Sequence, residues 1–399
     1  MKNKIKILII NVSYLNHNYG AQGLVFSLTD QLNKYLDAEY TLFIREKYYE
    51  KNLSFANKYG FNIVPFPRLA GLFRKEYINV VKEIKKSDVI INLAGIEFFG
   101  NNPPKLRWKD YIDVTVVQFI NLLFRKPYFR FTSSYGPFPD RIYKFFVKRA
   151  LNNLPFVFVR GEENLKDIQE LKLKAPVYSF PEVSIGLVPE NKDWANSYIN
   201  NLGLDLHKSI VGFSPSAVIN RISPDHIKLC KEIIAFFQSK NRQILLIPHS
   251  IEDGIDLRSC DLALCRKIYS ELKNKKNVFI VSDTSLTYKQ ARAIVGLLEF
   301  YITGRYHGLS SALSIAVPVI SLSWHKKYRD MMSLFLDDFL TVDCKTTSIS
   351  DSVELIKKYY EDRKWFNKEK VLKRKNQIIE QIDRSVEILI KEIKKCCKI

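Results

Sequence analysis

The sequence predicts an α/β protein built from two Rossmann-like domains, and three observations lead to this prediction. Short apolar runs alternate with helical patterns along the 399 residues. The runs are almost continuously apolar, which is typical of parallel strands covered by helices on both faces. A polar stretch from Leu187 to Lys208 divides the runs into two series. We therefore expect two parallel sheets that face each other across a cleft, followed by C-terminal helices.

Each half of the chain holds five or six predicted strands. Those of the first half are Ile5–Val12, Tyr40–Ile44, Val89–Leu93, Tyr128–Thr132, Phe156–Arg160 and Val177–Phe180. Those of the second half are Ile210–Ser214, Ile244–Pro248, Val278–Val281, Phe300–Thr303 and Val317–Leu322. Candidate helices between them are Gln22–Leu36, Lys144–Leu151, Asn164–Leu171, Asp225–Ser239, Ala263–Lys273 and Tyr288–Leu298. We place an N-terminal domain at residues 1–188, a C-terminal domain at 189–351 and basic helices at 352–399.

The formal net charge of +20 points to anionic partners, such as nucleic acid, phosphorylated substrates or an anionic membrane. Lysine as the default surface residue explains the charge equally well. In the tail, apolar residues recur at helical spacing from Ile378 to Ile393. This spacing favours a packing helix with a basic outer face. The alternative is a helix that lies on an anionic membrane surface.

The cysteines and the N-terminal residues indicate a cytoplasmic protein. None of the six cysteines forms a CxxC pair or has a histidine at metal-ligand spacing, so we expect reduced thiols and no metal. The chain has no run of about 18 uncharged apolar residues and no cleavage-site pattern near Met1. We expect the protein in the cytoplasm, either free or at the inner face of the membrane.

Polar residues follow the predicted strands, and ligands of open α/β sheets bind beyond the carboxyl ends of the strands. In the first half these residues are Asn18 and Gly20 before a helix, Ser134, Arg160 and Glu182. In the second half, His249 follows a strand and a proline. Structural interpretations compete with the functional ones: Arg160 is as well explained by an ion pair with a neighbouring helix, and His249 by packing.

The most informative segment runs from Phe300 to Lys327. A strand turns at Gly304 into a helix that begins near Gly308, and the backbone N–H groups of such a helix start attract anions. Arg305 and His307 lie within the turn, where they supply a fixed cation and a proton-transfer group. Lys327 follows the next strand. The segment therefore predicts a site for an anionic ligand.

The chain resembles the polysaccharide pyruvyl transferase family from about residue 8 to 335. The residues that carry the resemblance are Gly304-Arg305-Tyr306-His307-Gly308, Ala312, Pro318 and Lys327, with Gly136-Pro137-Phe138, Val159-Arg160, Leu165, Pro248-His249 and Asn18-x-Gly20 elsewhere. Three positions depart from the family pattern: Ala94-Gly95 where two or more glycines are frequent, Pro181-Glu182 where Pro-Asp is frequent, and Trp324 where tyrosine is common. These departures bear on the acceptor more than on the fold.

The resemblance implies a fold similar to the GT-B glycosyltransferases, often with C-terminal helices that pack back across the domains. It implies an enzyme that moves the pyruvyl group of phosphoenolpyruvate onto two hydroxyls of a sugar, giving a pyruvate ketal and phosphate, with no cofactor and no metal. For the donor it implies Arg305, Lys327, His249 and Gly308, with His307 as general acid/base. For the acceptor, lipid-linked, nucleotide-linked or polymeric, it implies Asn18, Gly20, Ser134, Arg160 and Glu182.

Two other functions fit parts of the sequence. In a GT-B glycosyltransferase with a nucleotide-sugar donor, Arg305 and Lys327 would hold a diphosphate. In a nucleic-acid-binding protein the positive charge would hold a phosphate backbone, although no helix-turn-helix, zinc-finger or aromatic RNA motif is present. A family member that binds the donor but has lost ketal formation is a third possibility. The sequence fixes neither the acceptor nor the oligomeric state.

Overall fold

The described part of the chain forms two compact α/β units. The computed structural model describes residues 4–12, 14–67, 76–98, 123–136, 138, 140–251 and 256–398. The first unit consists of Met1–Asn16, Leu24–Ser184 and Glu380–Ile399, and the second of His17–Gly23 and Ile185–Ile379. The chain therefore enters the second unit twice, first with a seven-residue segment between Asn16 and Leu24.

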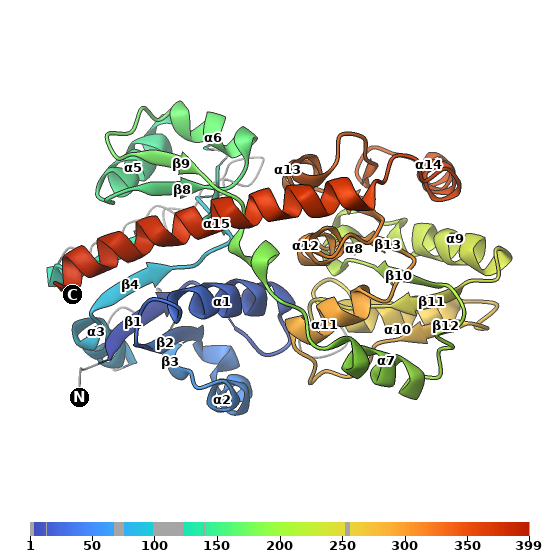
Figure 1. The fold of residues 1–399 in the computed structure, drawn as a ribbon, viewed down its shortest axis with the longest axis horizontal. Helices are drawn as coiled ribbons and strands as arrows, with labels where there is room; N and C mark the ends of the chain where they lie inside the picture. Colours follow the sequence, from blue (N-terminus) through green and yellow to red (C-terminus); the bar gives the residue numbers. More distant parts are fainter. Residues whose placement is uncertain are drawn as a thin grey trace. The chain divides into compact units, whose positions relative to one another are not determined.

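The first unit is built on a parallel sheet whose strands lie in the order β3-β2-β1-β4-β6 (Figure 1). These strands are β1 (Ile5–Ile10), β2 (Ala38–Arg45), β3 (Asn62–Phe66), β4 (Val89–Asn92) and β6 (Tyr128–Arg130). Two further parallel pairs are β5 (Ile96–Glu97) with β7 (Ser134–Tyr135), and β8 (Val157–Val159) with β9 (Val177–Ser179). The helices are α1 (Tyr19–Leu32), α2 (Tyr49–Lys58), α3 (Glu76–Lys86), α5 (Arg141–Asn152) and α6 (Glu162–Gln169), the first turn of α1 belonging to the second unit.

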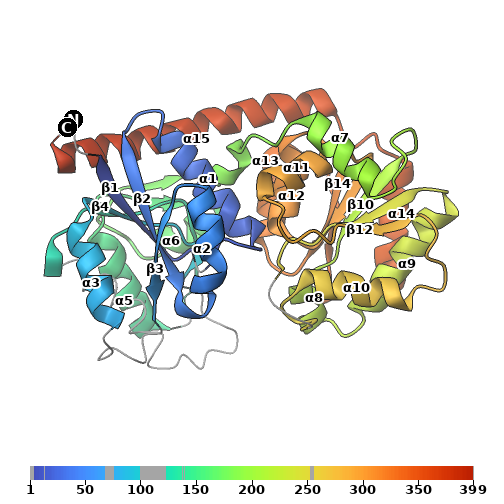
Figure 2. The same ribbon diagram turned by 90° about the horizontal axis from the view of Figure 1, so that it is seen from below.

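The second unit is built on a parallel sheet in the order β12-β11-β10-β13-β14-β15. Its strands are β10 (Ile210–Ser214), β11 (Gln243–Leu246), β12 (Val278–Ile280), β13 (Phe300–Thr303), β14 (Val319–Ser323) and β15 (Thr341–Asp343). Its helices are α7 (Lys192–Asn201), α8 (Ala217–Ile222), α9 (His226–Ser239), α10 (Asp261–Glu271), α11 (Tyr288–Val295), α12 (Tyr306–Ser314), α13 (Lys327–Phe335) and α14 (Ile349–Glu361). They lie on both faces of the sheet (Figure 2).

The two faces of this second sheet differ in chemistry. Alternate residues of a strand point to opposite faces, and Val211, Phe213 and Ile302 enter an apolar core with α9, α10 and α14. The residues between them, including Ser214 and Tyr301, therefore face the side of α11 and α12. One face of the sheet is thus apolar and packs in the core, which stabilises the unit. The other face carries hydroxyl groups close to the ends of β10 and β13.

The last helix, α15 (Lys368–Cys397), is a packing helix. Its apolar positions, among them Ile378, Ile382 and Leu389, are buried. Within the first unit, Gln31 of α1 donates a hydrogen bond of 3.2 Å to Asp383 of α15. Among the described residues, no helix combines the length and the apolar character that crossing a membrane requires.

The structure confirms the predicted fold class, with differences at the sheet edges. The strands Ile210–Ser214 and Phe300–Thr303 occur with the predicted bounds. The edge strands β3 and β15 were not predicted. Helix α10 begins at Asp261, two residues before the predicted start at Ala263, and this small shift brings a carboxylate into the site described below.

A glycine in the central strand makes room for the ring of Tyr301. A Cβ at Gly212 would overlap the Leu298 side chain and lie 2.8 Å from Cδ2 of Tyr301. We expect Gly212→Ala to lower the free energy of unfolding by about 1–3 kcal/mol through overpacking. The measurement is the midpoint of urea unfolding. An unchanged midpoint would show that the ring of Tyr301 can move at no cost, contrary to this view of the packing.

Candidate active site

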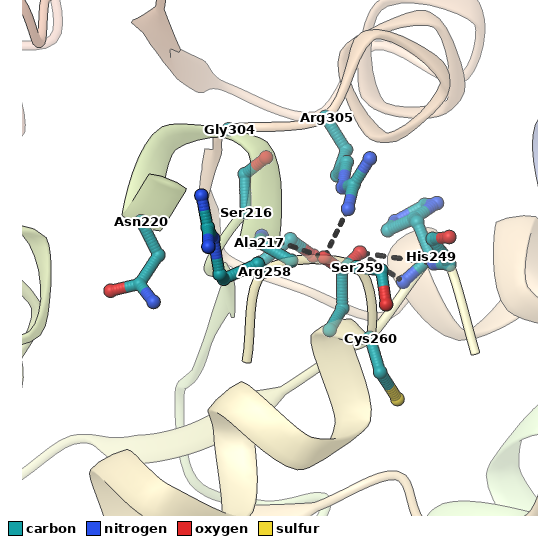
Figure 3. A network of polar contacts seen from close by, with 12 residues as sticks. Ser216, Ala217, Asn220, His249, Arg258, Ser259, Cys260, Gly304 and Arg305 are labelled. Atoms are coloured by element: carbon teal, nitrogen blue, oxygen red, sulfur yellow. Dashed lines mark hydrogen bonds and ion pairs between the residues drawn. The ribbon is translucent and has the colours of Figure 1, made fainter. Parts of the chain in front are cut away.

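The candidate site lies at the carboxyl ends of β10, β11 and β13 in the second unit. β10 pairs with β11 on one side and with β13 on the other, all in parallel. The residues that follow these three strands are therefore neighbours, although they are far apart in the sequence. They include Ser216, His249 and Arg305, together with Asp261 at the start of α10 (Figure 3).

The carboxylate of Asp261 ties the three strand ends together. It is fully buried. Its Oδ1 accepts a hydrogen bond of 2.9 Å from the backbone N–H of Ala217 and forms an ion pair with Nη2 of Arg305. Its Oδ2 accepts from the backbone N–H groups of His249 (3.2 Å) and Ser250 (3.0 Å). A buried carboxylate needs such partners, so this network fixes the loops and the arginine at once.

Arg305 is the residue just before α12, at its N-cap position. Its side chain is largely buried and directed by the ion pair with Asp261. The first turn of α12 directs its backbone N–H groups towards the same end, where the helix dipole favours negative charge. A guanidinium and a helix N-terminus therefore act together on any anion that binds there.

Glycines allow the first turn of α12 to approach its neighbours closely. A Cβ at Gly308 would lie 2.5 Å from Oγ1 of Thr303, 2.9 Å from the Tyr301 hydroxyl and 3.0 Å from Nε2 of His249. A Cβ at Gly304 would lie 2.8 Å from Cβ of Ser216. Any larger residue at either position would push the helix start away from the strand ends.

His307 lies in the first turn of α12 and is half-buried. Its ring packs edge-on against Tyr288, with 5.9 Å between ring centroids, and the Tyr288 hydroxyl donates to the His307 carbonyl at 2.9 Å. A Cβ at Gly20 would lie 2.9 Å from Nδ1 and from Cε1 of His307. The histidine ring is thus held between α11 and the first turn of α1.

The segment His17–Gly23 completes this wall of the second unit. Asn18 forms a β-bridge with Ser250, and its side-chain oxygen accepts a hydrogen bond of 3.2 Å from the N–H of Ala21. The side-chain oxygen of Gln22 accepts from the N–H of Tyr288 at 2.7 Å. Asn18 and Gly20, predicted on the acceptor side, therefore lie beside His249 and His307 and belong to the second unit.

His249 is buried and neutral. Its Nε2 is 2.9 Å from the Tyr301 hydroxyl, and its ring packs edge-on against Tyr19 at 5.5 Å between centroids. Burial, helped by the nearby Arg305 and His307, lowers the pKa of His249 to about 3. At neutral pH the imidazole carries no charge, so it can exchange a hydrogen bond with a ligand but adds no fixed positive charge.

Lys327 lies near the same turn, at the start of α13. Its ammonium group faces the rings of Trp324, Tyr306 and Tyr328, at 4.9, 5.3 and 5.6 Å from their centroids. Such cation–π contacts orient a lysine at little cost in solvation. Trp324 Nε1 donates to the Tyr328 hydroxyl at 2.9 Å, and that hydroxyl donates to the Gly304 carbonyl at 2.9 Å. The residue that departs from the family pattern, Trp324, therefore supports both Lys327 and the turn before Arg305.

The other predicted acceptor residues form a separate network in the first unit. Arg160 forms a buried ion pair with Glu182, and it donates to the Ser134 hydroxyl at 3.0 Å and to the Gly95 carbonyl at 2.6 Å. These contacts give Arg160 the structural partner that the sequence had suggested as an alternative. A role in acceptor binding stays a prediction for Ser134, Arg160 and Glu182. Pro137 lies outside the described residues.

A second buried pair, Arg130 with Glu97, lies at the ends of β6 and β5 in the first unit. Asn92 donates to the same carboxylate. The coulombic effect of Glu97 raises the pKa of Arg130 even though burial acts in the opposite direction. In the part of the chain that the structure describes, no group of three or more His, Cys, Asp or Glu side chains could hold a metal ion.

Sequence reasoning missed two residues of the site, Asp261 and Tyr301. Asp261 follows Cys260 at a helix start, and an acid in the first turn of a helix is usually interpreted as stabilising that helix. Tyr301 lies inside a strand that reads as wholly apolar. The first could have been found by asking which acid could pair with Arg305. The second has no signal beyond its hydroxyl group in a buried strand.

The fold has counterparts among solved structures. HepE from Anabaena, in complex with UDP and glucose, has a TM-score of 0.61 and 12% identity over 97% of this chain and 98% of that chain. A glycosyltransferase from Rickettsia africae has a TM-score of 0.59 and 10% identity over 99% of both chains. A UDP-GlcNAc 2-epimerase from Methanocaldococcus jannaschii has a TM-score of 0.58 and 11% identity over 98% of this chain and 100% of that chain. These likenesses define a GT-B-like fold.

The sequence identifies the family within that fold. The family model described as polysaccharide pyruvyl transferase matches residues 18–326, which include the residues of the candidate site from Asn18 to His307 and end just before Lys327. The chain therefore belongs to the polysaccharide pyruvyl transferases, a family of enzymes. No curated protein gives a significant match to the sequence.

Asp261 is expected to be essential for the arrangement of the site. In Asp261→Asn, the amide has one acceptor oxygen where the carboxylate accepts four hydrogen bonds. We expect a loss of about 2–4 kcal/mol in the free energy of unfolding, because buried donors lose their partner. Urea unfolding measures it, with the exposed Asp256→Asn as a matched control. Equal effects of the two substitutions would contradict the proposed importance of the buried carboxylate.

Gly20 offers a way to displace His307 without touching it. Gly20→Ala places a methyl group against Nδ1 and Cε1 of the ring, at the start of a helix where alanine is otherwise favourable. We expect the melting temperature to change little and the rate of the enzymatic reaction to fall at least about tenfold, since small misplacements of a reacting group are costly. A loss of stability with full activity in the remaining folded protein would contradict this.

Proposed function

We propose that the protein transfers the pyruvyl group of phosphoenolpyruvate to two hydroxyls of a sugar, forming a pyruvate ketal in the synthesis of a cell-surface polysaccharide or exopolysaccharide. The observation that carries the proposal is the arrangement of Arg305, braced by Asp261, at the N-terminus of α12, with His307 two residues further on. Membership of the pyruvyl transferase family supports it.

The donor is a small dianionic or trianionic molecule with a phosphate and a carboxylate. Arg305 and the first N–H groups of α12, next to Gly308, bind one of these groups in the proposal, because a guanidinium matches planar and tetrahedral oxyanions. Lys327, held by three aromatic rings, binds the other as a point charge. Asp261 offsets the charge of Arg305 only in part, since it is shared among four donors.

The reaction needs proton transfer at several atoms. The methylene carbon of the donor gains a proton, the two sugar hydroxyls lose one each, and the departing phosphate gains one. His307 acts as the general acid for the methylene carbon, because imidazole exchanges protons near neutral pH. His249 lies in the same wall and takes part as a neutral group, since its low pKa argues against a role as a phosphate-binding cation.

The acceptor is a sugar whose carrier the chain does not reveal. In the proposal, Asn18 and Gly20 contact the attacking hydroxyls, which is supported by their position beside the two histidines. Ser134, Arg160 and Glu182 are proposed to act on the acceptor through the loops that they hold together. A lipid-diphosphate or nucleotide carrier is compatible with the basic chain. Lipid-linked acceptors would bring the enzyme to the inner face of the membrane.

A nucleotide-sugar glycosyltransferase is the second candidate. It is favoured by one observation: HepE, which shares the fold, has been crystallised with UDP and glucose. The match of the family model across the site favours pyruvyl transfer. Thermal-shift assays with phosphoenolpyruvate and with UDP-glucose separate the two functions, because a ligand that binds only the folded state raises the melting temperature.

The variants Arg305→Ala and His307→Ala test the proposal directly. We expect His307→Ala to lower the rate of phosphate release from phosphoenolpyruvate about 10²–10⁴-fold, as loss of a general acid does, and Arg305→Ala to raise the KM for the donor as well. The product, examined by mass spectrometry, should be the acceptor plus pyruvic acid less one water. Wild-type rates in both variants would overturn the assignment.

A further inference from the structure

The hydrogen bonds around His249 leave only one arrangement of protons. Ser214, Tyr301 and His249 form a buried chain at the ends of β10, β13 and β11. Ser214 Oγ is 2.5 Å from the Ile247 carbonyl oxygen and is also hydrogen-bonded to the Tyr301 hydroxyl. A carbonyl oxygen only accepts, so the single proton of Ser214 points to Ile247.

The direction of the remaining bonds follows from this first one. Because the Ser214 proton is used, the bond between Ser214 and Tyr301 takes its proton from Tyr301. The Tyr301 oxygen must then accept from its next neighbour, Nε2 of His249, at 2.9 Å. Thr303 also approaches Tyr301, but its hydroxyl proton goes to the Arg305 carbonyl at 3.2 Å. It therefore does not change the assignment of protons among Ser214, Tyr301 and His249. His249 therefore carries its proton on Nε2.

The other ring nitrogen of His249 is left as a bare acceptor. Nδ1 is buried and has no hydrogen-bond partner among the residues that the structure describes. A buried acceptor without a donor is costly, and such atoms are uncommon in folded proteins. The charged and titratable groups nearest to this ring come from each element packed around it: Arg305 and His307 of the α12 start, Tyr301 of β13, Tyr19 of α1 and Asp261 of α10.

We propose that Nδ1 of His249 accepts the proton of a hydroxyl group of the bound acceptor sugar, and that Tyr301 and Ser214 are positioning residues that keep this nitrogen unprotonated. This inference rests on the proposed pyruvyl transfer. In the resting protein a bare Nδ1 can receive a hydroxyl proton, and it has a proton to give to the phosphate only after it has taken one. His249 therefore acts first as a base, whereas His307 acts first as an acid.

The protons balance with one histidine for each task. As the first hydroxyl oxygen bonds to the central carbon of the donor, its proton moves to Nδ1 of His249, while His307 gives a proton to the methylene carbon. The bond between the central carbon and the phosphate oxygen then breaks, its electron pair leaves with the phosphate, and the phosphate takes the proton from His249. As that bond breaks, the second hydroxyl oxygen bonds to the same carbon and passes its proton to His307. Both histidines return to their starting states.

The bound donor makes this transfer easier. In the absence of a ligand, burial and the positive charge of Arg305 keep His249 neutral. An anionic donor held by Arg305 offsets that charge and raises the proton affinity of Nδ1 at the moment when a hydroxyl approaches. Nδ1 of His249 therefore carries no proton in the protein without ligand, and it becomes a better base once the donor is bound.

The test begins with the tautomer, measured on the full chain by ¹⁵N NMR of histidine-labelled protein. The six histidines are assigned by comparison with His249→Gln, and with His249→Asn if the first variant does not fold. We expect His249 to show a protonated Nε2 and an unprotonated Nδ1 at neutral pH. A protonated Nδ1 would overturn the proposal, whatever the enzyme catalyses.

Two variants then change the chain of hydrogen bonds in different ways. Ser214→Ala releases the Tyr301 proton, which can turn towards Nε2 of His249 and move the histidine proton to Nδ1. Tyr301→Phe removes the acceptor for Nε2–H and should give a mixture of tautomers. In both variants we expect kcat to fall at least about tenfold, roughly the effect of one hydrogen bond, with the KM for phosphoenolpyruvate within about twofold.

Matched controls separate this role from general effects on packing. Ser321→Ala removes a buried hydroxyl from β14, and Tyr40→Phe removes a hydroxyl from the first unit, where it donates to Asn33 at 2.7 Å. Both should leave the His249 tautomer and kcat unchanged. If the wild type transfers the pyruvyl group but Ser214→Ala and Tyr301→Phe leave kcat and the His249 tautomer unchanged, as the controls do, the role of His249 is wrong. The proposed function then still stands. If the wild type transfers no pyruvyl group, the proposed function and this role fall together, and only the tautomer assignment stands.

Discussion

The carboxylate of Asp261 is the feature on which the site of the second unit depends. Burying a charge is unfavourable unless every part of it is paired, and here backbone N–H groups from two strand ends and the guanidinium of Arg305 share it. The same interaction that stabilises the loops therefore sets the direction of the arginine, so the stability of the loops and the orientation of Arg305 cannot be separated at this residue.

Close approach is the second constraint, and it explains the glycines of the Gly304–Gly308 turn. The turn needs its glycines less for unusual backbone angles than for space. Gly308 allows the first turn of α12 to touch Tyr301 and His249, and Gly304 allows the chain to pass Ser216. Gly20 has the same function for His307 from a distant part of the sequence. The Gly304–Gly308 turn, whose glycines suggest a flexible loop, is thus a tightly packed connection between β13 and α12.

The strands and site residues that follow from a local pattern could be predicted from the sequence. Those that depend on contacts between distant parts of the chain could not. Strands in the middle of the second sheet were placed correctly because they are mostly apolar runs, as β10 and β13 show. The edge strands β3 and β15 were missed because β3 contains Pro65 and β15 has only one apolar residue among its three, both ordinary features of sheet edges. Arg305, His307 and Lys327 could be found from spacing and family resemblance. Asp261 would have needed a search for an acid to pair with Arg305, and Tyr301 gave no signal, because the importance of both arises from neighbours on other strands.

The two histidines of the site show how one fold can give the same side chain two different environments. His249 is enclosed, neutral and joined to a chain of hydroxyl groups that ends at the Ile247 carbonyl, an oxygen that can only accept. His307 lies in a half-buried first helical turn, against Tyr288 and beside Gly20. Ketal formation moves protons to and from carbon and oxygen without net gain or loss. In the proposed reaction each histidine exchanges a proton in the opposite order to the other, and their environments differ in burial and in hydrogen-bond partners.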